Sequence, residues 1–227
     1  EQESITEYFG YSRGEAPILG FCRWDALTDR SDPADRIILV MPTWRLWLEE
    51  NTSEEFVRST YYRNYSGLLT DPRLLAALKE NHTRLIFYIH PKLRDHLQDF
   101  KADESIIELI PFGEQPLNEI IMKCSMLITD YSSVCWDAYY LEKPVLFYHF
   151  DREDYITAHG GSYLDFSTEL FGDSFETGDA LVDGIIACME DGFREKEAYA
   201  AMRPRYFAYR DDNNCKRTYD FIVSKGF

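Results

Sequence analysis

Five short apolar runs recur along this chain, and proline or a polar cluster stops most of them. The segments between the runs have helical spacing and helix end signals. Strands that alternate with helices predict an α/β fold, with one Rossmann-like parallel sheet and helices on both of its faces. The expected strands are 37–41, 84–89, 106–110, 126–128 and 145–148.

Some of the intervening segments carry clear start signals. Asp71 followed by Pro72 is a favourable helix beginning, because Asp caps a helix and Pro suits its first position. The pattern after Phe150 is less regular, and a short strand is expected at 18–21. The expected helices are 53–65, 72–80, 93–100, 117–124, 134–141, 180–189, 194–202 and 215–224.

Polar loops follow four of the expected strands. Open parallel sheets bind ligands outside the carboxyl ends of their strands, so these loops are expected to converge on one site. They are Pro42–Arg45, His90–Lys92, Pro111–Glu114 and Thr129–Ser133.

The loop Thr129–Ser133 places two hydroxyls and several backbone N–H groups at the start of an expected helix. Such groups have no partner within the helix and favour an anion, so the turn suits a phosphate. The alternative is that Ser132 or Ser133 only caps the helix, although capping and phosphate binding can coexist. Asp130 could bind a metal, orient a ligand hydroxyl or cap the turn.

The other loops offer further candidates, each with a structural alternative. Arg45 could grip phosphate oxygens with its planar donors, or form a surface salt bridge. His90 could donate to a phosphate oxygen when neutral and add charge when protonated, or make a structural hydrogen bond. Lys92 is expected to be a solvated charge. Pro111 and Phe112 could frame a base, or form a packed loop.

Composition and missing motifs argue against several classes of function. The 227 residues carry a formal net charge of −16, which argues against nucleic-acid binding. Five cysteines without C-x-x-C spacing argue against a disulfide framework or a zinc site and favour a reducing cytosol. No apolar run has the length of a membrane span. P-loop, G-x-G-x-x-G and G-x-S-x-G motifs are missing.

Three motifs, in their order, resemble the CDP-glycerol glycerophosphotransferase family, whose enzymes build or prime teichoic acid and related capsule polymers. They are Pro42-Thr43-Trp44-Arg45, His90-Pro91 and Thr129-Asp130-Tyr131-Ser132-Ser133. The likeness extends over nearly the whole chain, through Gly20–Leu27, Asp137, Lys143-Pro144, Asp151, Tyr155, 161–166 and 207–222.

The resemblance implies one half of a two-domain GT-B architecture. Residues 1–30 would be a lead-in from a preceding domain, and residues 31–227 a domain that binds a CDP-polyol donor such as CDP-glycerol or CDP-ribitol. The chain starts at Glu1 without Met, so it is expected to be a piece of a longer protein. The implied partners are the donor, a polyol-phosphate or glycan acceptor and an N-terminal half. The implied location is cytoplasmic, at the inner face of the membrane through regions outside this chain.

The resemblance also assigns roles to residues. His90 would contact the donor pyrophosphate and is the catalytic candidate, while Ser132 and Ser133 would hold the phosphates. The loop at Pro111 would meet the cytosine. The remaining substrate-binding candidates are Thr43, Arg45, Thr129 and Asp130. An acceptor hydroxyl would attack the polyol-bearing phosphorus and release CMP, with no cofactor and no metal.

The chain departs from the family pattern at several positions. Cys22 replaces the usual Pro, Trp24 is bulky, and the segment 211–214 lacks the usual Gly. A histidine motif of the H-G-T-P type is missing, so this chain alone is expected to bind donor without efficient transfer. The alternatives are a GT-B transferase for a nucleotide sugar, a non-catalytic nucleotide-binding module and a flavodoxin-like regulatory domain. The sequence has no acidic pair after its first expected strand, which argues against a receiver domain of the flavodoxin-like kind.

Overall fold

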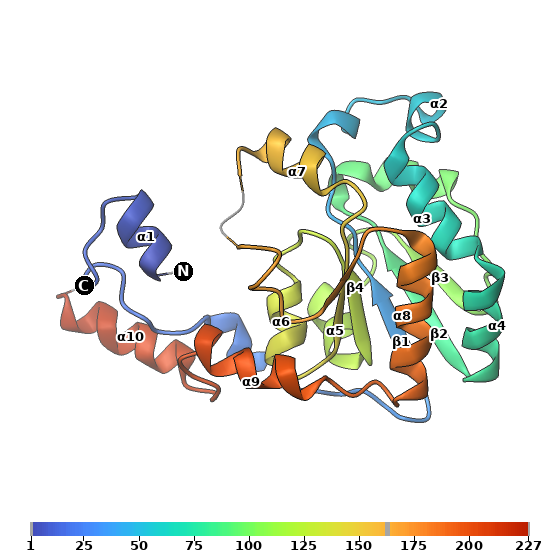
Figure 1. Ribbon diagram of the computed structural model, residues 1–227. Helices are drawn as coiled ribbons and strands as arrows, with labels where there is room; N and C mark the ends of the chain where they lie inside the picture. Colours follow the sequence, from blue (N-terminus) through green and yellow to red (C-terminus); the bar gives the residue numbers. More distant parts are fainter. Residues whose placement is uncertain (1, 162–163, 227) are drawn as a thin grey trace.

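The computed structural model describes residues 2–161 and 164–226. Six parallel strands form one sheet in the order β3-β2-β1-β4-β5-β6 (Figure 1). The strands are β1 (Arg36–Val40), β2 (Thr83–Tyr88), β3 (Ile107–Ile110), β4 (Met126–Thr129), β5 (Val145–Tyr148) and β6 (Asp173–Phe175). The α/β class and all five expected strands are confirmed, and β6 adds a further strand at one edge.

Helices cover both faces of the sheet (Figure 1). The α-helices are α1 (Gln2–Tyr8), α2 (Ser53–Phe56), α3 (Thr60–Thr70), α4 (Pro72–Glu80), α5 (Leu117–Lys123), α6 (Cys135–Tyr140), α7 (Arg152–His159), α8 (Gly178–Glu190), α9 (Glu197–Tyr206) and α10 (Asn214–Ser224). The 3-10 helices are η1 (Cys22–Ala26), η2 (Leu46–Leu48) and η3 (Pro91–Asp99).

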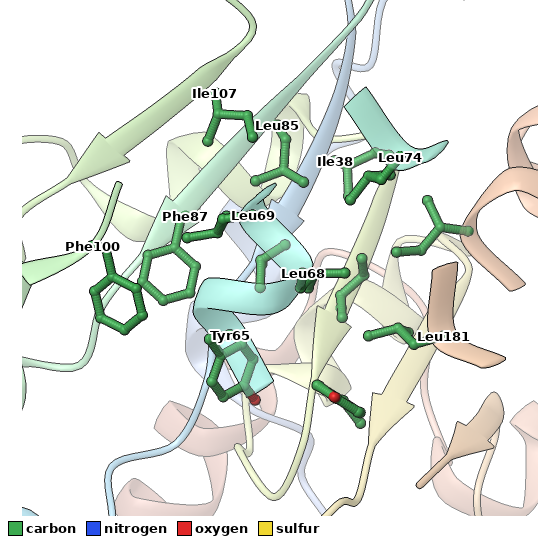
Figure 2. Packing of buried hydrophobic residues seen from close by; sticks show 14 of the residues in the cluster. Ile38, Tyr65, Leu68, Leu69, Leu74, Leu85, Phe87, Phe100, Ile107 and Leu181 are labelled. Atoms are coloured by element: carbon green, nitrogen blue, oxygen red, sulfur yellow. The ribbon is translucent and has the colours of Figure 1, made fainter. Parts of the chain in front are cut away.

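Successive residues of β1 point into two different cores. Ile38 and Val40 face the side that holds α3, α4 and α8, whereas Ile37 and Leu39 face α5 and α6. Figure 2 shows the first of these cores, where Leu68 and Leu69 of α3 lie among side chains of β1 and β2. Because both faces are covered, the central strands β1, β4 and β5 are apolar over most of their length rather than alternating with polar residues.

The structure corrects several expected elements. Residues 18–21 form no strand, and Ile18 is exposed with no strand pairing it. The helix expected at 53–65 is two helices, because Ser59 accepts the Tyr62 N–H at 3.1 Å and caps α3 anew. The segment 93–100 is the 3-10 helix η3. Ser162 and Tyr163, within the resembling segment 161–166, lie outside the described residues.

The lead-in is fastened to the last helix. The carboxylate of Asp25 accepts the backbone N–H groups of Asn214 at 2.9 Å and Cys215 at 2.7 Å, and so caps α10 from far away in the sequence. Desolvation acts to raise the pKa of Asp25, but these hydrogen bonds outweigh it and lower the pKa to about 2. Gly20 has φ +79, and a Cβ there would lie 1.8 Å from Asn214 Oδ1, so the close approach requires glycine.

A second clamp holds the lead-in against α6. Asp137 Oδ1 accepts the indole N–H of Trp24 at 2.6 Å and the Nε–H of Arg23 at 3.0 Å. Asp137 therefore faces the lead-in, and the segment Gly20–Leu27 that resembles the family motif has a structural role in this chain.

Candidate functional site

The loop after β1 contacts the loops after β2 and β4 at the carboxyl edge of the sheet. The backbone N–H of Thr43 donates to Asp130 Oδ1 at 2.8 Å. The hydroxyl of Thr129 donates to the Met41 carbonyl at 2.6 Å. The rings of Trp44 and His90 stack with centroids 5.8 Å apart. These three loops and the loop after β3, which begins at Pro111, follow four adjacent strands, and we call this region the strand-end site.

Arg45 lies beneath this site and is completely buried. Its Nε and one terminal nitrogen donate to the two oxygens of Asp151 at 2.6 and 2.9 Å, and the same terminal nitrogen donates to Asp130 Oδ2 at 2.9 Å. The other terminal nitrogen donates to the Thr43 carbonyl at 2.6 Å. The guanidinium thus reaches protein carboxylates rather than open space, which is a different setting from the phosphate contact expected for it.

Aromatic rings enclose this buried ion cluster. The guanidinium carbon of Arg45 lies 5.1–5.6 Å from four ring centroids, those of Tyr61, Tyr131, Phe150 and Tyr155. Desolvation acts to lower the pKa of Arg45, but the two carboxylates outweigh it and raise the pKa well above its ordinary value. Arg45 therefore stays protonated, and its bonds to Asp130 and Asp151 tie the ends of β1, β4 and β5 together.

Asp130 has no free acceptor direction. Its Oδ1 also accepts the Tyr131 N–H at 2.6 Å, and its Oδ2 accepts the Tyr65 hydroxyl at 3.1 Å. Its side chain is fully buried. Of the roles expected for Asp130, the geometry fits a carboxylate that orders the turn.

His90 has one ring nitrogen, Nε2, without a partner among the described residues. Its Nδ1 accepts the backbone N–H of Lys92 at 3.2 Å, so the proton of the neutral ring lies on Nε2. Burial lowers the pKa of His90, and the charge of Lys92 lowers it further. The imidazole is therefore a neutral Nε2–H donor at pH 7 in the unliganded chain.

The turn after β4 offers further neutral donors. Ser132 Oγ accepts the Val134 N–H at 3.4 Å, Ser133 is exposed, and neither side chain caps α6. Within the described residues, the backbone N–H groups of Ser132 and Ser133 have no acceptor. The helix α6 has only six residues, so these local groups matter more than its dipole.

Two threonine hydroxyls complete the expected set. The Thr129 hydroxyl is used in the bond to Met41 and is not available to a ligand. The Thr43 hydroxyl is buried and has no partner among the described residues. Pro111 begins the loop after β3, where exposed Phe112 contacts the ring of Tyr88.

Sequence reasoning named Asp151 and Tyr155 only as part of the resemblance and left out their place in the site. Tyr131, Tyr155 and His159 form a continuous ring stack, with centroids 3.8 and 4.2 Å apart. His159 also meets the edge of Trp44 at 6.3 Å. The signal in the sequence was the polar Asp151 soon after β5, at the same edge of the sheet as the other loops.

Two hollows of the molecule lie away from the strand-end site. One of about 660 Å³ runs beside β3, and one of about 400 Å³ lies near the amino ends of β1 and β2. Among the described residues, no group of three or more metal-ligating side chains comes together, and no helix is both long and apolar enough to span a membrane. The strand-end site is defined by the loops that converge at the carboxyl edge of the sheet.

Comparison with known families decides the relationship. The sequence profile described as CDP-Glycerol:Poly(glycerophosphate) glycerophosphotransferase matches residues 2–224. The chain belongs to this family. The resemblance carried by the three motifs is thereby confirmed.

Individual members of the glycerophosphotransferase family agree. The minor teichoic acid biosynthesis protein GgaB of Bacillus subtilis (strain 168) is 28% identical over 224 residues, which are 95% of this chain and 24% of GgaB. The teichoic acid glycerol-phosphate transferase of Staphylococcus aureus (strain NCTC 8325 / PS 47) is 26% identical over 189 residues, which are 82% of this chain and 44% of that protein. This chain spans less than half the length of either relative.

Solved structures show the same fold. A variant of the wall teichoic acid polymerase TagF superposes with a TM-score of 0.72 at 19% identity, over 98% of this chain and 54% of that one. A TagF structure soaked with CDPG gives a TM-score of 0.69 at 17% identity, over 98% of this chain and 52% of that one. The fold is thus that of one half of a GT-B architecture.

Proposed function

We propose that this chain is the donor-binding domain of a polyol-phosphate transferase. It binds CDP-glycerol or a related CDP-polyol, and the transferase moves the polyol phosphate to a hydroxyl of a teichoic-acid or capsule-type acceptor, releasing CMP. The observation that carries the proposal is that the loop with His90 and the loop with Ser132 and Ser133 both contact the loop after β1, at the carboxyl edge of the sheet. The family profile also covers this chain almost completely.

In this proposal His90 acts on the donor pyrophosphate. Its Nε2–H donates to a phosphate oxygen, and protonation lets it stabilise the charge that develops on the departing CMP. The hydroxyls and free N–H groups of Ser132 and Ser133 hold the other phosphate oxygens. The loop at Pro111 is proposed to contact the cytosine. Catalysis is then positioning and charge stabilisation, without a metal.

Arg45, Asp130 and Thr129 support the site from below in the proposal. Arg45 contacts no ligand and fixes the loops that carry Thr43 and Asp130. Asp130 orders the first peptide of the Ser132–Ser133 turn through the Tyr131 N–H. These three are positioning residues, whereas His90, Ser132 and Ser133 contact the donor.

We infer that residues 1–30 are a lead-in to residues 31–227, and that a second half supplies the acceptor side. The length of the relatives supports this, because the chain corresponds to about half of each TagF chain. The histidine motif that the sequence lacks is expected in that other half.

Calorimetric titration with CDP-glycerol, CDP and UDP tests the donor. Binding of both cytidine compounds without UDP is the expected result. Binding of UDP alone would contradict the proposal and favour a transferase that uses a nucleotide sugar. If none of the three nucleotides binds to this chain or to the longer protein, the proposed donor site is contradicted.

Two substitutions separate ligand contact from structure. His90→Asn keeps a side-chain acceptor for the Lys92 N–H but removes the Nε2 donor, whereas His90→Ala removes both. Both are expected to weaken CDP-glycerol binding roughly 10- to 100-fold, and only His90→Ala to lower the melting temperature.

A second pair of variants tests the serine turn. Ser132→Ala should weaken CDP-glycerol binding, and Ser224→Ala, at the end of α10, should not. Unchanged affinity in both the His90 and Ser132 variants would contradict the site.

A further inference from the structure

Two of the five cysteines meet where the lead-in joins α10. Cys22 opens η1, Cys215 is the second residue of α10, and both are exposed. Cys215 Sγ lies 3.6 Å from the Cys22 carbonyl oxygen, and Cys22 Sγ lies 3.5 Å from the Thr218 hydroxyl oxygen, one helical turn further along α10. The two side chains therefore share one small space, although the residues are 193 positions apart.

The backbones that carry the two sulfur atoms are held together. Asp25, three residues after Cys22 within η1, accepts the backbone N–H of Cys215 at 2.7 Å. The Nε–H of Arg217 donates to the Leu19 carbonyl at 2.9 Å on the other side of Cys22. A disulfide needs close, converging backbones, and these bonds keep the two segments side by side.

The other three cysteines are in a different situation. Cys124 and Cys135 are buried, and Cys188 is half-buried. Burial raises the pKa of Cys124 to about 12 and the pKa of Cys188 to about 11. These three thiols are less accessible to a small disulfide than the exposed Cys22 and Cys215.

We propose that Cys22 and Cys215 are a modification site, a thiol pair that closes to a disulfide by exchange with a low-molecular-weight disulfide. The pair lies apart from the strand-end site and does not depend on the proposed function. Closure fastens the lead-in to α10 with a covalent bond.

Asp25 sets the order of the two steps. Its carboxylate, which faces the Cys215 thiol, raises the pKa of Cys215 to about 11, and the Cys22 side chain adds to this. In the proposed sequence of steps Cys22 attacks first, because Asp25 favours the protonated thiol of Cys215. Its thiolate bonds to one sulfur of the small disulfide and expels the other half as a thiolate, which takes up a proton. Cys215 then attacks the Cys22 sulfur and expels the second half. The two protein thiols are oxidised, and one small disulfide is reduced to two thiols.

Treatment of the chain with oxidised glutathione tests the pair. The expected product has lost two hydrogens, carries no glutathione, and gives a Cys22–Cys215 linked peptide by mass spectrometry. Its melting temperature should rise, because the link closes a long loop. Dithiothreitol should reverse both changes.

Single variants identify the steps. Cys215→Ser should accumulate one glutathione on Cys22, whereas Cys22→Ser should take up glutathione at Cys215 several-fold more slowly. Cys188→Ser should still close the link at the rate of the unaltered chain. A chain that carries glutathione on both cysteines, or that keeps both thiols free while Cys215→Ser reacts at Cys22, would overturn the proposal.

Discussion

At the scale of single residues, Arg45 shows how burial changes the meaning of a motif. A polar Pro-Thr-Trp-Arg loop at a strand end is a good candidate for anion binding. In the structure, the guanidinium donates hydrogen bonds to Asp130, Asp151 and the Thr43 carbonyl. Removing one partner from such a buried cluster leaves uncompensated charge, which is far more costly than losing a surface pair.

Arg45→Met is therefore expected to lower the free energy of unfolding by about 3–5 kcal/mol, because it leaves two buried carboxylates without their cation. Urea unfolding followed by circular dichroism measures the change. Arg58→Met is the matched control, since Arg58 pairs with Glu54 on the surface and both side chains are more than two-thirds exposed. Equal stability of the two variants would contradict the structural role of Arg45.

His90 makes a prediction about pH. Burial and Lys92 lower the pKa of the free imidazole, while Asp130 and Glu49 act in the opposite direction. A bound pyrophosphate favours the protonated ring, so its pKa rises on binding. Affinity for CDP-glycerol should therefore increase as the pH falls from about 7.5 to about 5.5.

CDP-glycerol is the suitable ligand for this test, because a terminal phosphate such as that of CDP titrates near pH 6. Calorimetry at the two pH values with His90→Asn should show the dependence removed. A dependence that persists in this variant would place the titrating group elsewhere.

At the scale of elements, the strands and their order along the chain follow from the sequence. Apolar runs such as 37–41 and 145–148 are covered on both faces, so their continuous apolar composition is enough to predict them as strands. The helix α7 was not predicted, because none of its residues is buried and it has no apolar stripe. The three-residue β6 is too short and polar to be recognised.

Only the general position of the candidate site follows from the sequence. Topology places His90 and the loop Thr129–Ser133 at the same edge of the sheet, because parallel strands end there. The partners of Arg45 cannot be predicted from topology, because its bonds to Asp130 and Asp151 join residues that are 85 and 106 positions apart. Such pairing is decided by packing that local patterns do not contain.

At the scale of the whole molecule, α1 and α10 lie together to one side of the sheet (Figure 1). Tyr219, Ile222 and Val223 of α10 form one helical stripe, and Tyr219 is 67% exposed. Asn214 is the only buried residue recorded for this helix. A short helix with an unpacked apolar stripe needs a partner surface. We expect that surface on the proposed second half, since the solved relatives are about twice as long as this chain.

Hydrogen exchange tests this docking. Amides of α10 should exchange rapidly in this chain and slowly in the longer protein, and Ile222→Asp should restore rapid exchange. Ser224→Asp, which introduces the same charge off the stripe, should keep the protection. Equal exchange in both proteins would contradict the docking, and concentration-dependent dimers of this chain would assign the stripe to a second copy instead.

The buried cluster of Arg45, Asp130 and Asp151 also constrains how this sequence can evolve. Each single replacement passes through a chain with unpaired charge in its interior, which selection would remove. The three positions should therefore be inherited as a unit, so that homologues keep all of them or have exchanged them together. A survey of homologous sequences should show this covariation even where His90 and the serine turn are lost.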